Sequence, residues 1–284
     1  MKYILVLLLI MNIVMSSASA KSSKCSMEKS YRPDCYLKRN DKVLNIALLY
    51  YGDYWSMTDL ERIEPILIER FFKATNQQLE LRVLVKKVFS FKQKMPADFE
   101  FNNIKDPARL QRIYYSEKVG GKVIPEVYEE FKRRDSENVL GQLDAILAIT
   151  GAQFEGLGLA DGRVSVTEHP REIAWGLPDG GRVEYITDYR IVDELIHELG
   201  HNMFLGHTST QCQKPELTLE QRKQCCEQSP SKDDVLSYCR NRQNVDENFM
   251  HGFESCNQSM IEKLVIPSML KGGKWKVPGR SRCQ

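Results

Sequence analysis

The sequence predicts an α/β fold built on a twisted, mostly parallel β-sheet. Residues 43–51 and 144–150 are apolar runs with the length and composition of buried strands, and residues 79–86, between them in the chain, alternate in the pattern of a further strand. An amphipathic helix expected over residues 58–73 joins the first two strands. A strand, helix, strand order implies a right-handed crossover, which makes these two strands parallel. The glycine-rich residues 151–162 are expected to form a loop after the third strand.

The helix over residues 58–73 is predicted from apolar residues at helical spacing. Thr58 and Glu61 have the spacing of a capping box at its N-terminus. Pro65 lies inside the helix, where a proline can introduce a kink. The positions expected to face the core are Leu60, Ile63, Ile66, Leu67 and Phe71.

The elements further along the chain are predicted from shorter patterns. Two helices are expected near Pro107–Val119 and Pro125–Arg134, as candidates for an insertion over the sheet. After the glycine-rich loop, either Val164–Val166 or residues 173–175 are expected to supply a short edge strand. Residues 183–186 are expected to form a strand that leads directly into the next helix.

The first twenty residues have the pattern of a secretion signal. A positive start is followed by the apolar residues 4–15 and by the small residues 18–20, which suit a cleavage site. The apolar stretch is shorter than the roughly 20 residues that span a bilayer. We therefore expect a secreted, extracytoplasmic chain that begins near Lys21 and has no stable membrane insertion after removal of residues 1–20.

Charge and cysteine content limit the class of protein. The 40 basic residues nearly balance the 38 acidic ones, so charge gives no support to a nucleic-acid partner. Eight cysteines in an exported chain are typical of disulfides. Adjacent Cys225 and Cys226 are expected to tie two different segments, because they cannot readily bond to each other. A second, cysteine-bound zinc is the alternative, although the chain has no C-x-x-C pair.

Residues 197–207 carry the chemistry that the sequence predicts. On a helix, His197 and His201 lie on one face, about 6 Å apart along the axis, where two imidazoles can reach one metal ion. His207 can supply a third nitrogen if the chain turns after the helix. Three imidazole ligands with one open position are typical of a catalytic zinc site. Glu198 is placed to act as the general base toward a water molecule at the metal.

The local sequence supports this helix. Thr187 or Asp188 can cap its N-terminus by accepting hydrogen bonds from the first turn. Gly200 weakens the helix by about 1 kcal/mol relative to alanine. A close approach of another segment would explain a residue without a side chain at position 200.

At these residues the chain resembles the metzincin metallopeptidases, whose H-E-x-x-H-x-x-G-x-x-H motif is followed by a Met-turn. The resemblance implies that His197, His201 and His207 bind zinc, that Glu198 is the catalytic base, and that Met250 forms the Met-turn. Residues 253–264 are similar to the adamalysin-like branch of the family. The resemblance implies an α+β zincin-like fold with one antiparallel edge strand, an active-site helix and a disulfide-stapled C-terminal subdomain.

The chain departs from the motif at one position, because Phe204 stands where the family has glycine. That glycine normally adopts a positive φ to end the helix, which a bulky residue does poorly. Gly206 is expected to end the helix instead, two residues later. If His207 fails as a ligand, Glu216 or Glu220 is the alternative third ligand.

Five other residues have a functional and a structural interpretation. Cys25 or Cys35, as a thiolate, can occupy the open zinc position, whereas a structural disulfide is the simpler hypothesis. His251 is expected to be a solvated turn residue rather than a fourth ligand, and His169 a loop residue. Asn257 begins a glycosylation motif that is used only in a eukaryotic host.

The sequence thus predicts a secreted zinc endopeptidase that hydrolyses peptide bonds in protein or peptide substrates. The expected organisation is a signal at residues 1–20, an N-terminal segment at 21–42 and a catalytic domain at 43–284. Within that domain, the upper subdomain reaches about residue 207 and the lower subdomain covers residues 208–284. The alternative is a catalytically silent exported protein of the same fold that binds zinc or a protein.

Overall fold

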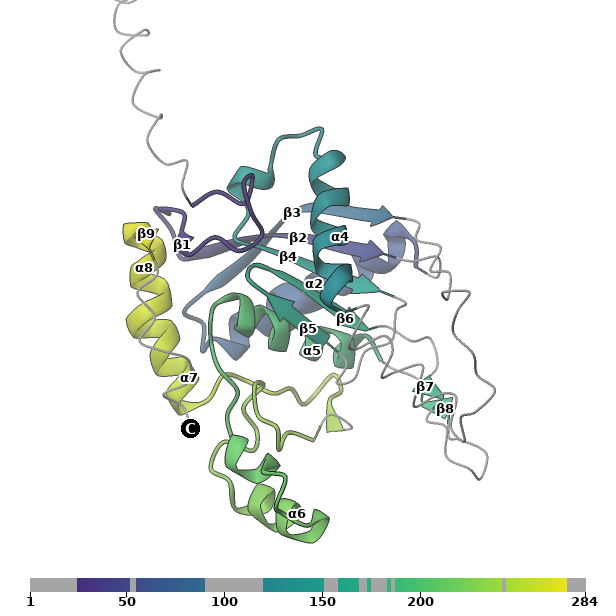
Figure 1. Cartoon of the computed structure of the whole chain (residues 1–284), viewed down its shortest axis with the longest axis vertical. Helices are drawn as coiled ribbons and strands as arrows, with labels where there is room; N and C mark the ends of the chain where they lie inside the picture. The colour runs from purple at the N-terminus through teal and green to yellow at the C-terminus, as the bar shows by residue number, and fades with distance from the viewer. Residues whose placement is uncertain are drawn as a thin grey trace, which may run out of the picture.

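A computed structural model describes the following residues: 25–51, 55–89, 120–150, 158–168, 173–174, 183–184, 187–241 and 244–274. Its centre is a five-stranded sheet in the order β3-β2-β4-β6-β5 (Figure 1). The five strands are β2 (Val43–Tyr51), β3 (Glu80–Phe89), β4 (Ala145–Thr150), β5 (Gly158–Asp161) and β6 (Val164–Glu168). A separate pair is formed by β7 (Ile173–Ala174) and β8 (Val183–Glu184).

The direction of the strands confirms a mostly parallel sheet. Strand β2 pairs in parallel with β3 and with β4, and β4 pairs in parallel with β6. Strand β5 is antiparallel to β6 and lies at the edge of the sheet. The prediction that Val164–Val166 or residues 173–175 form the edge strand is wrong. The edge strand comes from the last residues of the predicted loop, because β6 pairs with β4 and the hairpin turns at Gly162, whose φ is 60°.

Helices cover the two faces of the sheet (Figure 1). Helix α4 (Gly120–Arg133) packs on one face with a core that includes Val123, Val127 and Phe131. Helices α2 (Met57–Ala74) and α5 (Asp188–Asn202) pack on the other face, over a larger apolar core. Every residue of β2 and β4 is buried, and cover on both faces of the sheet explains why the two strands are mostly apolar.

The boundaries of the predicted helices differ in detail. Helix α2 begins at Met57, and the carboxylate of Asp59 accepts hydrogen bonds from the N–H and Oγ of Ser56 at 2.8 and 2.9 Å. The predicted capping box of Thr58 and Glu61 is therefore wrong, because Ser56 occupies the N-cap position one turn before Asp59. The predicted helix at 107–119 lies outside the described residues.

The C-terminal part of the chain is built from short elements. They are the 3₁₀ turn η4 (Thr210–Gln213), α6 (Leu219–Gln228), a helical column of α7 (Ser255–Met260), η6 (Ile261–Val265) and α8 (Ile266–Lys271), and β9 (Gly273–Lys274). Helix α6 lies at the lower tip of the molecule, and none of its ten residues is buried (Figure 1). Disulfides Cys212–Cys225 and Cys226–Cys239 hold it, which confirms that the adjacent cysteines tie two different segments.

The N-terminal segment contacts both the sheet and the C-terminal part of the chain. Cys25 is bonded to Cys35, so the hypothesis of a zinc-blocking thiolate is wrong. Strand β1 (Cys35–Tyr36) pairs with β9. The guanidinium of Arg163 is buried, donates to the carbonyl of Cys35 and lies 4.4 Å from the ring centre of Tyr36. The cysteine-bound zinc also finds no support, because Cys212, Cys226 and Cys239 are all in disulfides.

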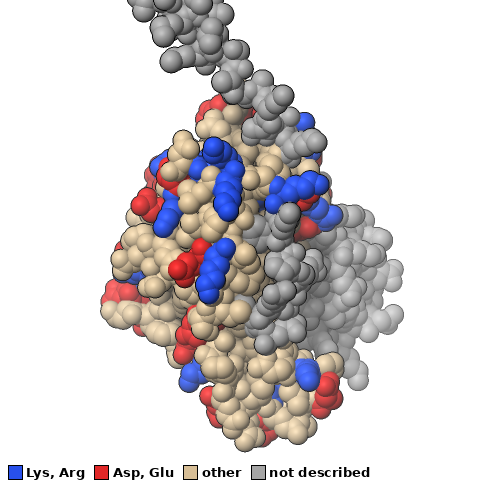
Figure 2. Space-filling view, turned by 90° about the vertical axis from the view of Figure 1, so that its left-hand side faces the viewer, with Lys and Arg blue, Asp and Glu red and all other residues tan. Residues whose placement is uncertain are grey.

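The described surface carries both signs of charge. On the face in Figure 2, lysine and arginine side chains are interspersed with acidic ones. Among the described residues, no helix combines the length and the apolar character that crossing a bilayer requires.

Helix α6 is expected to depend on its disulfides, because it has no buried face of its own. In a Cys212→Ser/Cys225→Ser variant, backbone amides of residues 219–228 should exchange with solvent much faster than in the parent chain. Hydrogen exchange followed by mass spectrometry measures this. The matched control is Cys25→Ser/Cys35→Ser, which should leave exchange in 219–228 unchanged. Equal protection in both variants would mean that α6 is held by packing.

Candidate metal centre

Helix α5 carries two of the three predicted ligands and the predicted base. Its N-cap is Thr187, one of the two expected caps, whose Oγ1 accepts a hydrogen bond from the N–H of Arg190 at 3.3 Å. The helix is buried from Ile191 to Gly200, so its histidines are fixed on a packed element. A site on a rigid helix holds its ligands in place better than a site on a loop.

The helix ends earlier than predicted. Its last residue is Asn202, and Phe204 adopts a left-handed conformation with φ 65°. The N–H of Leu205 donates to the carbonyl of Gly200 at 3.0 Å, and the N–H of Phe204 donates to the carbonyl of His201 at 2.9 Å. These two bonds define a Schellman ending, which satisfies carbonyls of the last turn. The prediction that Gly206 ends the helix is wrong.

Contacts of the Phe204 ring explain why a bulky residue tolerates this conformation. The ring meets the ring of Tyr36 edge-on, with 6.2 Å between centroids. The guanidinium of Arg163 lies 5.7 Å from its centre. A non-glycine residue in the left-handed region costs about 1–2 kcal/mol. Packing of a large aromatic ring can offset a cost of that size.

The early ending of α5 returns His207 to the helix. The three Nε2 atoms form a triangle with sides of 3.2 Å (His197 to His201), 3.1 Å (His201 to His207) and 3.3 Å (His197 to His207). Ligands in tetrahedral geometry at zinc–nitrogen distances of 2.0–2.1 Å lie about 3.3 Å from one another. The triangle of imidazole nitrogens therefore fits one zinc ion.

Groups outside the helix orient the three rings. Nδ1 of His197 lies 2.7 Å from the carbonyl of Val235, and Nδ1 of His201 lies 3.0 Å from the carbonyl of Leu205. Donation from Nδ1 to a carbonyl leaves the lone pair of Nε2 for a metal. The ring of Tyr238 stacks on His207, with 4.2 Å between centroids. Each ligand therefore has a defined ring orientation.

The environment of His197 and His201 favours their neutral forms. Burial, followed by the positive charge of Arg240, holds the pKa of His197 well below its ordinary value. Burial also lowers the pKa of His201. Only the neutral imidazole offers its lone pair, so both shifts favour metal binding over protonation.

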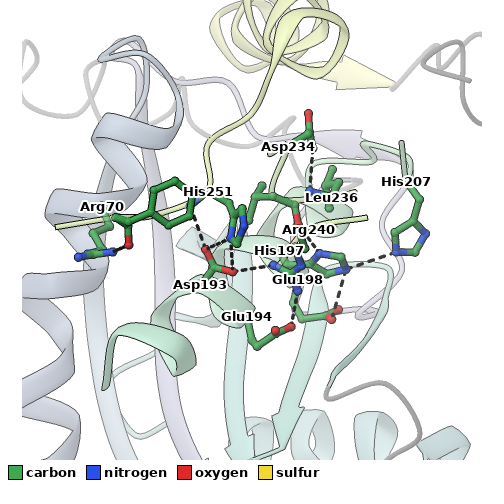
Figure 3. Close-up of polar contacts among 12 residues, drawn as sticks. Arg70, Asp193, Glu194, His197, Glu198, His207, Asp234, Leu236, Arg240 and His251 are labelled. Carbon is green, nitrogen blue, oxygen red and sulfur yellow. Dashed lines mark hydrogen bonds and ion pairs between the residues drawn. The ribbon is translucent and has the colours of Figure 1, made fainter. Parts of the chain in front are cut away.

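Glu198 lies beside the same point. Its side chain is almost completely buried, and Oε1 is 4.0 Å from Nε2 of His197. Figure 3 shows the carboxylate next to His197 and on the side of the ring that faces His207. A carboxylate in this place can accept a proton from a water molecule that binds at the open position of the metal.

A bridging segment, residues 234–238, connects the third ligand to the predicted Met-turn. The N–H of Val235 donates to the carbonyl of Gly252 at 2.7 Å, and the N–H of Thr208 donates to the carbonyl of Leu236 at 3.1 Å. The segment thus lies between the residues that follow His207 and the residues that follow Met250, and it carries the carbonyl that orients His197.

The carboxylate of Asp234 fixes the bridging segment. It accepts hydrogen bonds from the N–H groups of Leu236 and Glu254, at 2.7 and 2.8 Å, and from Nδ2 of Asn257 at 3.2 Å. Burial nevertheless raises the pKa of Asp234. Asn257 is fully buried in this contact, so the asparagine of the predicted glycosylation motif is inaccessible to solvent in the folded chain.

A buried ion cluster lies next to His197, on the side away from His207 (Figure 3). The guanidinium of Arg240 bonds Oδ2 of Asp193 at 2.8 Å and Oε2 of Glu194 at 2.6 Å. Nδ1 of His251 lies 3.1 Å from Oδ1 of Asp193. Burial alone would raise the pKa of Asp193, but His251 and Arg240 outweigh it and the pKa is lowered. The prediction that His251 is a solvated turn residue is wrong, because it is buried against Asp193.

The other residues that the sequence suggested for the site have different locations. Met250 is half-buried against the main core, directly before His251. Glu216 and Glu220 are exposed and lie outside the group of possible metal ligands, which His207 completes. His169 lies outside the described residues.

The expected approach of another segment to Gly200 is confirmed. A Cβ on Gly200 would lie 2.9 Å from Cε1 of Phe253 and 3.1 Å from Cδ1 of Leu236. The bridging segment and the residues after Met250 therefore pack closely against the helix at Gly200, between the two histidines.

Four residues around the site were not predicted from the sequence: Tyr238, Arg240 and the pair Asp193 and Glu194. The pair offered a signal, because two acidic residues stand one turn before His197, on the side of the helix that carries His197 and Glu198. Tyr238 and Arg240 gave no such signal, since they reach the site only through the fold of the lower subdomain.

Three solved structures show what the chain resembles. Archaemetzincin from Methanopyrus kandleri is 18% identical, with 80% of this chain and 98% of that chain covered and a TM-score of 0.43. A zinc-dependent peptidase from Methanocorpusculum labreanum is 14% identical, with 76% and 100% covered and a TM-score of 0.37. Metalloproteinase-II from Bacteroides fragilis is 11% identical, with 85% and 57% covered and a TM-score of 0.36. No protein-family model and no curated protein matches the sequence. At TM-scores this low, the likenesses do not assign the chain to a family.

Removal of Arg240 is expected to destabilise the fold strongly. Arg240→Met leaves two buried carboxylates without their cation, which should lower the free energy of unfolding by about 3–5 kcal/mol. Denaturant unfolding measures the loss. The matched control is Arg133→Met, which breaks an exposed pair with Glu130 and should cost less than about 1 kcal/mol. Similar small losses in both variants would contradict a buried cluster.

The left-handed conformation of Phe204 predicts an unusual order of stability. Phe204→Gly and Phe204→Ala both lose the ring, but only alanine keeps the strain, so the glycine variant should be more stable by about 1 kcal/mol. Lys132, exposed in α4, is the matched control, because glycine there should be about 1 kcal/mol less stable than alanine. Urea unfolding of the four variants measures both differences. The same sign at both positions would contradict the Schellman ending.

Proposed function

We propose that the chain is a secreted zinc-dependent endopeptidase of the metzincin type. The observation that carries the proposal is the convergence of three imidazole nitrogens on one point with the carboxylate of Glu198 beside them. Three neutral nitrogen ligands leave a fourth position open, which distinguishes a catalytic from a structural zinc site. The motif of residues 197–207 and the turn at Met250 support the family, and residues 253–264 support its adamalysin-like branch.

Each residue of the site has a separate role in the proposed reaction. His197, His201 and His207 hold the metal, which supplies Lewis-acid polarisation of the scissile carbonyl and of a water molecule when bound. Glu198 would take a proton from the attacking water molecule and deliver it to the leaving amine. The amide bond is hydrolysed without a nucleophilic side chain.

The edge of the sheet suits a peptide substrate. Strand β5 lies at one of the two edges of the described sheet and packs on α5, the helix that carries Glu198. An extended peptide that adds to such an edge has its backbone held along the strand. Three disulfides among the described cysteines suit an oxidising, extracytoplasmic compartment and thus the proposed secretion.

A catalytically silent zinc protein is the second candidate. It requires the three histidines but not Glu198, since a carboxylate outside the ligand set adds nothing to zinc retention. Glu198 is buried next to the metal position, and a buried carboxylate carries a desolvation cost. That cost is understandable if the group acts on a water or a substrate, so we favour the enzyme.

Glu198→Gln is expected to reduce casein hydrolysis by about 10²–10⁴-fold while the purified protein still holds one zinc per chain. The matched control is Glu220→Gln on the exposed helix α6, which should leave hydrolysis unchanged. His207→Ala should lose zinc and activity together. Zinc content is measured by atomic absorption. Zinc binding without hydrolysis in the parent chain would support the silent protein, and unchanged hydrolysis in Glu198→Gln would exclude the proposed base.

A further inference from the structure

Small side chains line the part of the sheet on which the C-terminal half of α5 rests. In the β5–β6 hairpin, Gly158 is directly opposite Thr167, and Ala160 is directly opposite Ser165. Opposite residues of an antiparallel pair share one face of the sheet. Oγ of Ser165 donates to Oδ1 of Asn202 on α5 at 2.9 Å, so this is the face that meets the helix. The hairpin therefore presents two cross-strand pairs of small residues to the helix. We call these two pairs the rungs of Gly158 and Ala160.

The two rungs match two positions on the helix. Glu198 and Asn202 are four residues apart, which places them about 6 Å apart along the axis of α5. The rungs of Gly158 and Ala160 are two residues apart, which places them about 6.6 Å apart along β5. The bond between Asn202 and Ser165 fixes one end of this register. Glu198 consequently lies over the rung of Gly158.

The contact at Gly158 leaves no room for any side chain. An ideal Cβ on Gly158 would lie 2.8 Å from Cδ and 3.0 Å from Cγ of Glu198, and still closer to Oε1. Real Cβ atoms essentially never approach a neighbour this closely. Because Glu198 is almost completely buried, its end cannot swing far to make space. Its carboxylate is held between the backbone of β5 and His197, whose Nε2 is 4.0 Å from Oε1.

We propose that Gly158 is a positioning residue, which sets the place of the Glu198 carboxylate by presenting bare backbone at the edge of the sheet. The inference rests on the proposed function for its catalytic consequence, whereas the contact itself is a property of the fold. A methyl group at position 158 displaces the carboxylate from the water it activates. A misplacement of about 1 Å in a catalytic group can lower the rate by about 100-fold.

The first test is the kinetics of Gly158→Ala on a peptide substrate. We expect kcat to fall by about 100-fold, with KM nearly unchanged and one zinc per chain retained. The matched control is Gly141→Ala, where the new Cβ also meets a glutamate side chain, Glu28 Oε1 at 3.1 Å, but away from the metal centre. That variant should keep its kcat. A rise in KM with unchanged kcat, or loss of zinc, would overturn the proposal, because either result means that the substitution disturbs the strand rather than the base.

The second test asks whether Gly158 acts through Glu198. Glu198→Asp shortens the side chain and makes room for a Cβ, so adding Gly158→Ala to that background should have little further effect on kcat. The same loss in both backgrounds would overturn the proposal.

A third measurement does not depend on catalysis. Thermal unfolding of the zinc-loaded protein should show a fall in Tm for Gly158→Ala that is smaller when Glu198 is alanine. If the parent chain proves to have no peptidase activity, this coupling still tests the contact. An equal fall in both backgrounds would show that the Cβ does not meet Glu198.

Discussion

The metal centre depends on a reversal of the chain within two residues of the end of helix α5. If the helix continued, residue 207 would lie about 9 Å further along the axis than His201 and on another side. The left-handed Phe204 instead ends the helix and brings the third imidazole to within 3.1 Å of the second. The same turn presents the carbonyl of Leu205 to the ring of His201, so it orients one ligand while it returns another.

Residues after the third histidine set the orientation of the other two rings. The bridging segment, residues 234–238, brings the carbonyl of Val235 to His197 and the ring of Tyr238 to His207. Its position depends on the buried carboxylate of Asp234, which joins it to the column that starts at α7. The helix therefore places the ligands, while a segment about forty residues away determines which nitrogen of His197 faces the metal.

The sequence predicted what local periodicity and spacing determine. Strand β2 and the ligand set of His197, His201 and His207 follow from patterns within a few residues of one another. The conformation of Phe204 was predicted wrongly, because the groups that stabilise it, Tyr36 and Arg163, are distant in sequence. The environment of His251 was predicted wrongly for the same reason, since its partner Asp193 belongs to another element.

The three acidic residues around His197 have different surroundings, and this difference bears on the proposed role of Glu198 as the catalytic base. Asp193 and Glu194 both face the guanidinium of Arg240, whose charge also disfavours protonation of His197. Their negative charge is therefore compensated within the protein, and they keep the ion cluster in place. Glu198 is directed instead to the bare backbone of the edge strand, next to Nε2 of His197. This position beside Nε2 of His197 is the one that the proposed role of Glu198 as general base requires.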